Sequence, residues 1–396
     1  MKIKLHEPTF GEAEIQAAVD VLRSTHVTAG KEVRRFERAF ACINGAEHGI
    51  AVNSGSSANL IGVAALCNPA LPGHWERGDE VIIPALAWST TVWPLIQHGI
   101  VPVVVDVDPA TFNIDPEQVR RAIGPKTRGI MPVHVYGNPC EMYDLRSIAQ
   151  QHGLDIIEDC CEALGAAYNG LPVGQFGRAG TFSFYFSHHM TTLEGGMVLT
   201  QDTQLAELMR ILRAHGWTRD LENPEVYTEA HPDIDPRFLF VNVGYNVRMT
   251  EVQAAIGNVQ WPKLAGFVRA RQKNTFAWQE ELASYHVYFG FQRETPWAKS
   301  SCFGFPLVLK PSAPFSVREI REYLGWQNIE TRPIICGNIA RQPGLAMYPH
   351  RVVGDLSNAT NIMRRAFSFG NHQGIGEEER NYVVDQIGAF IRGRGI

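Results

Sequence analysis

Short apolar runs alternate with helix-length segments through the first half of the chain, and this alternation constrains the fold more than any other feature. The runs that read as strands are His48–Val52, Glu80–Pro84, Val101–Val105, Gly129–Val135, Leu154–Ile157 and Gly180–Phe184. Helical patterns lie between or after them, at Ser57–Leu66, Thr90–Gln97, Pro116–Ile123, Asp144–Gln151 and Thr203–Ala214. Strands joined by crossover helices form a mostly parallel sheet covered on both faces. The sequence therefore predicts the α/β class, with ligands at the carboxyl ends of the strands.

The second half of the chain follows other patterns. Asp220–Arg237 holds three prolines and several acids, which predicts a long loop with a functional purpose. Met249–Leu264 predicts a long helix that bridges to a second domain, and the tail after it has an α+β pattern. That tail contains an extended run at Cys302–Leu309 and helices at Ser316–Leu324 and Glu377–Ile391. We expect a large α/β domain over 1–250, then a bridging helix and a small C-terminal domain over 251–396.

Composition excludes several classes of protein. The 396 residues are 45% hydrophobic and 19% charged with a net charge of -5, so nothing favours nucleic acid as a partner. No apolar run reaches the roughly 18 residues of a membrane span, and the N-terminus does not look like a signal peptide, so we expect a cytoplasmic protein without membrane contact. The seven cysteines are scattered and form no C-x-x-C pair, which argues against disulfides and against a metal centre.

Two of the predicted strands are followed by segments suited to binding a flat anionic ligand. Asn53–Asn59 opens a helix, where Gly55 permits close backbone approach and Ser56 adds a hydroxyl donor. A plain strand-to-helix turn with a serine cap is the alternative. Trp88 follows the strand at 80–84, where an indole either stacks on a planar ring or packs in the core.

Two further segments carry acids and histidines. In Asp155–Gly165 an apolar strand ends in Asp159 and Glu162, and a buried acid needs a cation or hydrogen-bond donors. A protonated pyridine nitrogen is one such partner; a metal site and a helix N-cap are the alternatives. Thr181–Gly196 carries His188 and His189 before two glycines. A lone histidine is more often structural, and adjacent histidines on a strand face opposite ways, so they do not favour a metal.

Together these four segments resemble the sugar aminotransferase family of the DegT/StrS type, pyridoxal phosphate enzymes with the aspartate aminotransferase type I fold. The resemblance extends to Thr28–Lys31, Gly244–Met249 and Thr331–Pro333. It implies a cofactor site in which each residue has a role. Gly55, Ser56 and Ser183 would hold the phosphate, Trp88 would cover the ring, Asp159 would pair with the pyridine nitrogen and Glu162 with the ring hydroxyl.

The same resemblance implies an active site shared between two chains. Asn246 would reach the phosphate in the partner subunit, and Arg248 would meet the carboxylate of an amino-acid donor there. The functional unit would then be a homodimer. His215 and Arg219 fit a subgroup of the family and are placed near the sugar, although a histidine at a helix end is the plain alternative for His215.

One departure from the family pattern decides the expected reaction. The family motif reads Ser-Phe-x-x-x-Lys, but here Ser183 and Phe184 lead to His188 where the lysine would stand. A lysine amine bonds covalently to the cofactor aldehyde, whereas imidazole forms no such stable bond. Histidine titrates near pH ~6.5, so it can both remove a proton from the cofactor and protonate a leaving hydroxyl. His189 lies one position out of register and is read as a bystander.

Phe184–His189 resembles the subgroup of 3-dehydratases that act on GDP-4-keto-6-deoxymannose on the route to colitose-type sugars. That resemblance implies that L-glutamate converts pyridoxal phosphate to pyridoxamine phosphate, after which the nucleotide sugar loses its 3-hydroxyl to give a 3-deoxy-4-keto sugar and ammonia. A related dehydratase type with an iron–sulfur cluster needs closely spaced cysteines, which the region after Trp217 lacks. A nucleotide-sugar 4-aminotransferase using a lysine from elsewhere and a non-catalytic binding protein remain as alternatives. The guanine base rests on the resemblance alone.

Overall fold

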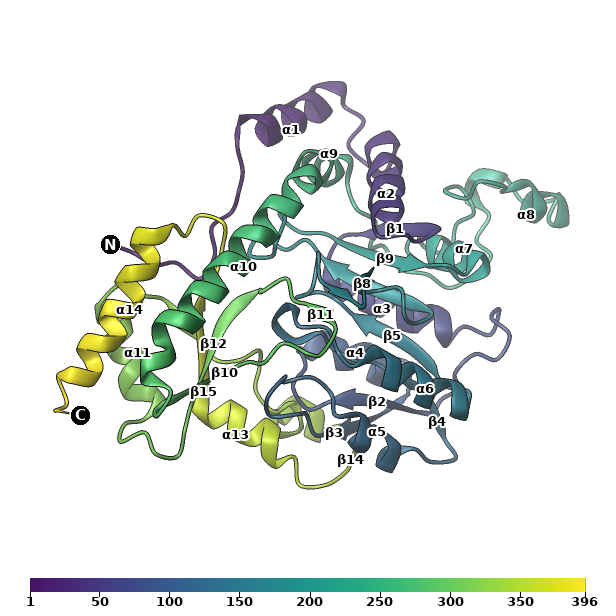
Figure 1. Cartoon of the computed structure of the whole chain (residues 1–396). Coiled ribbons are helices and arrows are strands. Elements are labelled where there is room, and N and C mark those ends of the chain that lie inside the picture. Colours follow the sequence, from purple (N-terminus) through teal and green to yellow (C-terminus); the bar gives the residue numbers. More distant parts are fainter. Residues whose placement is uncertain (396) are drawn as a thin grey trace.

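An eight-stranded sheet in the order β1-β9-β8-β5-β4-β2-β3-β14 forms the centre of the computed structural model, which describes residues 1–395 (Figure 1). Its strands are β1 (His48–Val52), β2 (Glu80–Pro84), β3 (Val101–Val105), β4 (Thr127–Ile130), β5 (Asp155–Asp159), β8 (Ala179–Ser183), β9 (Gly196–Thr200) and β14 (Arg351–Val352). Strands β8, β5, β4, β2, β3 and β14 pair in parallel, whereas β9 runs antiparallel to both β1 and β8. The predicted mostly parallel sheet is confirmed.

Helices bury both faces of this sheet, as the apolar strand sequences require. On β2, Val81 and Ile83 belong to a core shared with α3 (Gly55–Leu66), α4 (Ser89–Gln97) and α7 (Thr203–Leu212). The residue between them, Ile82, belongs to a second core with α5 (Pro116–Ala122) and α6 (Met142–His152). Successive side chains of a strand point to opposite faces, so a strand that is apolar at every position needs cover on both.

A smaller antiparallel sheet in the order β10-β12-β15-β13 has a core of its own. Its strands are β10 (Phe289–Phe291), β12 (Gly304–Leu309), β15 (Ala366–Gly370) and β13 (Thr331–Arg332), and it packs with α10 (Leu264–Glu281), α11 (Val317–Trp326) and α14 (Glu377–Arg392). Figure 1 shows α10 running from the large sheet to the small one. The α+β pattern predicted for the tail is confirmed.

The remaining elements are short or peripheral. A three-stranded sheet joins β11 (Ala298–Lys299), β6 (Ala167–Tyr168) and β7 (Leu171–Pro172). The other helices are α1 (Glu12–Ser24), α2 (Lys31–Ile43), α8 (Glu225–Ala230), α9 (Glu251–Gln260), α12 (Pro343–Ala346) and α13 (Ser357–Arg365). Short 3₁₀ turns occur at Val135–Gly137, Pro236–Phe238, Trp261–Lys263, Leu282–Tyr285 and Ile339–Arg341.

Most predicted elements differ from the structure by one or two residues at their ends, and three differ by more. The strand predicted at Gly129–Val135 ends at Ile130, close to Pro132, which has no N–H to continue a ladder. The helix predicted at Met249–Leu264 is two helices, α9 and α10, separated by a turn that contains Pro262. The long bridging helix is therefore α10. The loop predicted at Asp220–Arg237 contains the short helix α8.

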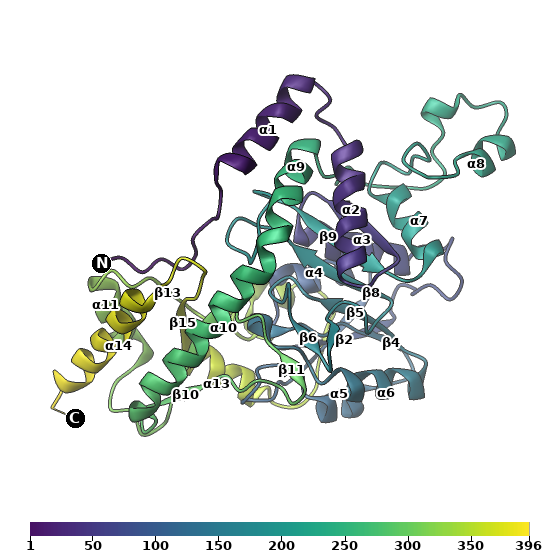
Figure 2. The same ribbon diagram turned by 45° about the horizontal axis from the view of Figure 1, so that its top comes forward.

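The division of the chain at residue 250 stays a prediction. Helix α9 lies just beyond it and packs against α1 and α2, and β14 from the C-terminal half pairs with β3 of the large sheet. The segment around α8 stands away from the rest of the chain in both views (Figures 1 and 2). No helix within residues 1–395 has the length and apolar character needed to cross a membrane.

Candidate active site

A cavity of about 340 Å³ opens at the carboxyl ends of β1, β2, β5 and β8. Its walls include seven of the predicted site residues, Gly55, Ser56, Trp88, Asp159, Glu162, Ser183 and His188. These residues come from segments far apart in the sequence, and the parallel strands bring them to one edge of the sheet. The other lining residues are Ser54, Asn59, Thr90, Val133, Cys161, Tyr185, Ser187, Glu194, Phe303, Arg332 and Ile335.

The start of α3 is built for close contact with an anion. A Cβ atom on Gly55 would lie 2.5 Å from Cβ of Ser183, so only glycine lets this turn pack against the end of β8. The Ser54 hydroxyl caps the helix by accepting the N–H of Ser57, and Ser56 Oγ lies 2.8 Å from Thr90 Oγ1. The predicted serine cap is therefore Ser54. Free N–H groups at a helix start, with hydroxyls beside them, suit a phosphate.

Asp159 is buried at the end of β5, and its carboxylate accepts three hydrogen bonds. Oδ2 accepts hydrogen bonds from Asn59 Nδ2 at 3.0 Å and Thr91 Oγ1 at 2.7 Å. Oδ1 accepts the backbone N–H of Cys161 at 3.1 Å. A carboxylate has about four acceptor positions, so these three donors leave room for one more from the cavity. A ring N–H fits that position, and the donors fix the carboxylate toward it.

Glu162 connects the cavity to the small sheet. Its Oε2 accepts the backbone N–H of Tyr136 at 3.0 Å, and its Oε1 lies 3.5 Å from Arg332 Nη2, on β13. Burial raises the pKa of the Glu162 carboxyl, while the Arg332 charge acts in the opposite direction. Arg332 Nε also donates to the Tyr136 hydroxyl at 3.1 Å.

His188 borders the cavity as a neutral imidazole. Its Nδ1 is buried and has no hydrogen-bond partner in the described part of the chain, which leaves Nε2 as the nitrogen that can meet a ligand. Burial, together with the positive charges of Arg332 and Arg271, lowers the pKa of His188 to about 3. The ordinary histidine pKa assumed from the sequence therefore does not hold. A neutral imidazole accepts a proton, and once protonated in this environment it is a strong acid, so both transfers stay available to it.

His189 does not line the cavity. Its ring is buried, with Nε2 3.0 Å from the carbonyl oxygen of Ser301 and the ring packed against Phe303. This is the structural role that is commoner for a lone histidine.

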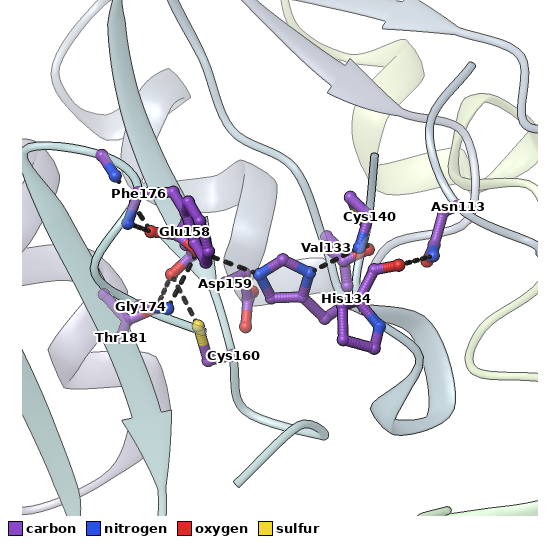
Figure 3. Close-up of polar contacts among 12 residues, drawn as sticks. Asn113, Val133, His134, Cys140, Glu158, Asp159, Cys160, Gly174, Phe176 and Thr181 are labelled. Atoms are coloured by element: carbon purple, nitrogen blue, oxygen red, sulfur yellow. Dashed lines mark hydrogen bonds and ion pairs between the residues drawn. The ribbon is translucent and has the colours of Figure 1, made fainter. Parts of the chain in front are cut away.

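A metal site was one alternative interpretation of the acids at the end of β5. His134, Glu158 and Cys160 do lie close together there (Figure 3). The Glu158 carboxylate, however, already accepts the backbone N–H groups of Gly174, Phe176 and Gly177. His134 Nδ1 accepts the N–H of Cys140, so its proton sits on Nε2, which faces Glu158 at 3.2 Å. Four donors satisfy this buried carboxylate without a cation, and the cluster anchors β5 beside Asp159.

The other four predicted site residues gather elsewhere. Asn246, Arg248, His215 and Arg219 do not line the cavity of their own chain. Arg219, Arg248 and His215 contact the Trp217 ring, and Asn246 contacts Arg248. The guanidinium carbons of Arg219 and Arg248 lie 4.9 Å and 5.7 Å from the Trp217 ring centroid. His215 Nε2 lies 3.4 Å from Arg248 Nη2, and Arg248 also contacts Asn246 Oδ1. The structure thus separates the predicted residues into a cavity group and a Trp217 group.

Several residues of the site were not assigned roles from the sequence. Asn59 and Thr91, which hold Asp159, lie near the start of the helices that follow β1 and β2, and a polar residue there was a usable signal. Phe303 and Arg332 come from the C-terminal half, and no local pattern connects them with His188.

Comparison with known proteins agrees with this geometry. The chain is 40% identical over 374 residues to GDP-4-keto-6-deoxy-D-mannose 3-dehydratase of Yersinia pseudotuberculosis, covering 93% of this chain and 94% of the relative. The crystal structure of the E. coli GDP-4-keto-6-deoxy-D-mannose-3-dehydratase with bound hydrated PLP superposes with a TM-score of 0.92 at 35% identity, covering 98% and 99% of the two chains.

A histidine-to-asparagine variant of GDP-4-keto-6-deoxymannose-3-dehydratase, solved with bound GDP-perosamine, has the same TM-score of 0.92 at 35% identity, covering 98% and 100%. The predicted type I aminotransferase fold is thereby confirmed. Residues 8–388 match the sequence model of the DegT/DnrJ/EryC1/StrS aminotransferase family. The chain belongs to the DegT/DnrJ/EryC1/StrS aminotransferase family.

Proposed function

We propose that this chain is a pyridoxal phosphate and pyridoxamine phosphate-dependent 3-dehydratase of a nucleotide-linked 4-keto-6-deoxyhexose, with GDP-4-keto-6-deoxymannose as substrate and L-glutamate as amino donor. Its products are the 3-deoxy-4-keto sugar, 2-oxoglutarate and ammonia. The enzyme acts in the cytoplasm, and its product enters the route to colitose-type sugars of the O-antigen. Relatives named for this reaction, at 40% and 36% identity, support the proposal.

The proposal depends on one observation: a histidine, and no lysine, lies at the cavity. Among residues 1–395, none of those that line the cavity is a lysine, and His188 stands at its edge. A family aminotransferase needs a lysine amine to bind the cofactor covalently and to release an amino product. The two lysines nearest to His188 in the sequence, Lys126 and Lys263, do not line it either, and Lys263 pairs with Glu14.

The cavity fits the cofactor at three points. The start of α3, with Ser56 and Ser183, would hold the phosphate, and a side chain larger than that of glycine at position 55 would have no space there. Asp159 keeps one acceptor position free for the ring nitrogen. Trp88 leaves 56% of its surface exposed beside the cavity, so its indole is available to cover a flat ring.

Pyridoxamine phosphate supplies an amino group that joins the sugar ketone and a ring that accepts electrons. The protein does the rest. Asp159 keeps the proton on the ring nitrogen. His188, through Nε2, would be the residue that takes up a proton beside the cofactor and delivers one to the C3 hydroxyl, which would leave as water. Two electrons from glutamate reduce C3 of the sugar, and the oxygen lost from C3 balances the one gained by 2-oxoglutarate.

The Trp217 group completes the site from a second chain. Asn246 reaches the phosphate of the partner subunit's cofactor, Arg248 the carboxylate of glutamate, and His215 and Arg219 the sugar nucleotide. The projecting segment around α8 supports a homodimer, because it exposes apolar side chains that a second copy would cover. Those side chains are Val226, Ile234, Phe238, Phe240 and Val243.

The experiment is to incubate the protein with glutamate and a panel of nucleotide 4-keto-6-deoxy sugars, then measure ammonia and product mass. We expect ammonia and a product lighter by one oxygen, with the GDP sugar used best. An amino sugar without ammonia would contradict the proposal. Borohydride reduction of the pyridoxal phosphate form gives an independent control, because a cofactor–lysine adduct would show that the chain is an aminotransferase.

A further inference from the structure

The ring of His188 borders the proposed active site, yet no hydrogen bond from residues 1–395 fixes its orientation. Nδ1 is buried without a partner, whereas a catalytic histidine is more often oriented by a carboxylate or carbonyl at that nitrogen. The only hydrogen bond that reaches His188 within residues 1–395 is made by its backbone N–H, which donates to the carbonyl of Tyr185 at 2.9 Å. Something other than a polar partner must therefore hold the imidazole.

Two aromatic rings contact the imidazole edge-on. The Phe303 centroid lies 5.1 Å from that of His188 at an interplanar angle of 71°, and the Tyr185 centroid lies 5.9 Å away at 90°. Both rings line the same cavity. Tyr185 precedes His188 by three residues and is exposed, whereas Phe303 is buried and comes from the C-terminal half. Phe303 is the contact that can restrict the ring independently of its own loop.

The Phe303 backbone is itself fixed. Its N–H donates to the Tyr136 carbonyl at 2.9 Å, and its carbonyl accepts from Nη1 of the buried Arg271 at 2.9 Å. Cys302, just before it, has a φ of 53°, which lies in the left-handed region. The Arg332 guanidinium carbon lies 5.1 Å from the Phe303 ring centroid. Two hydrogen bonds thus fix the Phe303 backbone, and the Arg332 guanidinium contacts the face of its ring.

We propose that Phe303 is a positioning residue for His188, and that its ring, rather than a hydrogen bond, holds the imidazole with Nε2 toward the ligand. The inference rests on the proposed function of His188. The Phe303 ring also excludes water from the imidazole, which agrees with the lowered pKa of His188. An ordinary wall residue would contribute to stability but would not control the ionisation or the turnover of His188.

Phe303→Leu tests this inference against Phe305→Leu as a matched control. Phe305 is a buried phenylalanine two residues further on, and it packs against Trp278 and Phe369 instead of His188. We expect Phe303→Leu to lower kcat roughly tenfold to a hundredfold with little change in KM, because small displacements of a catalytic group have effects of this size. Phe305→Leu should lose stability but keep kcat within about twofold. Phe303→Met, which keeps apolar volume without a rigid ring, serves if the leucine variant does not fold.

A second readout does not need substrate or cofactor. In apo protein labelled with ¹³C-histidine, the His188 signal is assigned by its loss in His188→Asn. That signal should not titrate between pH 5.5 and 8.5 in the wild type or in Phe305→Leu. In Phe303→Leu water reaches the ring, so it should titrate within this range. The inference would be overturned if Phe303→Leu behaved like the wild type, with no titration of the His188 signal in this pH range and an unchanged kcat. Absence of ammonia from the wild type would overturn the proposed reaction, while the titration would still decide the role of Phe303.

Discussion

The buried neutral imidazole of His188 should make the apo protein sensitive to acid, and His188→Asn should remove a measurable part of that sensitivity. The folded protein holds the pKa of His188 at about 3, whereas an unfolded chain has it near ~6.5. Between these two values the unfolded chain binds the proton and the folded protein does not. The free energy of unfolding therefore falls as the pH falls through this window.

The size of the effect follows from the two pKa values. At pH 7.5 both states are neutral and the contribution is close to zero. At pH 5 protonation of the unfolded chain favours unfolding by about 2 kcal/mol for this one residue. Burial, with the charge of Arg271, lowers the pKa of His372 to about 4, which adds about 2 kcal/mol more at pH 5. A typical free energy of unfolding is only about 5–15 kcal/mol, so these terms are large.

The assay is urea unfolding of apo protein at pH 7.5 and pH 5, at one protein concentration, for the wild type, His188→Asn and His286→Asn. Histidine 286 is exposed and serves as the control. The wild type and His286→Asn should lose similar free energy between the two pH values, and His188→Asn should lose about 2 kcal/mol less. An equal loss in all three proteins would refute the assignment of His188 as a buried neutral base.

Two further predictions concern the cofactor site and the shared active site. Gly55→Ala should weaken cofactor binding roughly tenfold or more, from a packing cost of about 1–3 kcal/mol against Ser183. Gly266→Ala, in open space on α10, should bind normally; spectrophotometric titration measures both, and equal affinities would contradict the cradle. Mixing inactive His188→Asn with inactive Arg248→Ala should restore about a quarter of the activity through hybrid dimers with one intact site. No recovery after subunit exchange would place both residues in the same chain's site.

Local patterns determined most of the large sheet. β1, β2 and β3 have the predicted bounds because each is a short apolar run between turn residues. β9 is not predicted from the sequence, although Met197–Leu199 is apolar, because this short run lies between the histidine segment that ends at Gly196 and the helix predicted from Thr203. Its place depends on antiparallel pairing with β1 and β8 at once, and β1 lies far away in the sequence. Such long-range pairing leaves no periodic signal in the strand itself.

The residue types of the cavity could be predicted from the sequence, but the lowered pKa of His188 could not. Resemblance placed His188 at the lysine position, yet the sequence does not show that Arg332, Arg271 and Phe303 surround it. Those residues come from α10, β13 and the segment before β12, and only the packing of the small sheet on the large one brings them there. The ordinary pKa of histidine was therefore the wrong starting value.

This environment acts on whatever base stands at position 188. Burial and two nearby guanidinium groups disfavour a positive charge, so they would hold a lysine amine neutral just as they hold the imidazole neutral. A neutral lysine amine is a nucleophile toward an aldehyde, whereas a neutral imidazole is chiefly a base. Under the proposed function, the same cavity would support covalent capture of the cofactor with one residue and proton transfer with the other. The surroundings would then set the charge, and the side chain at position 188 would set the reaction.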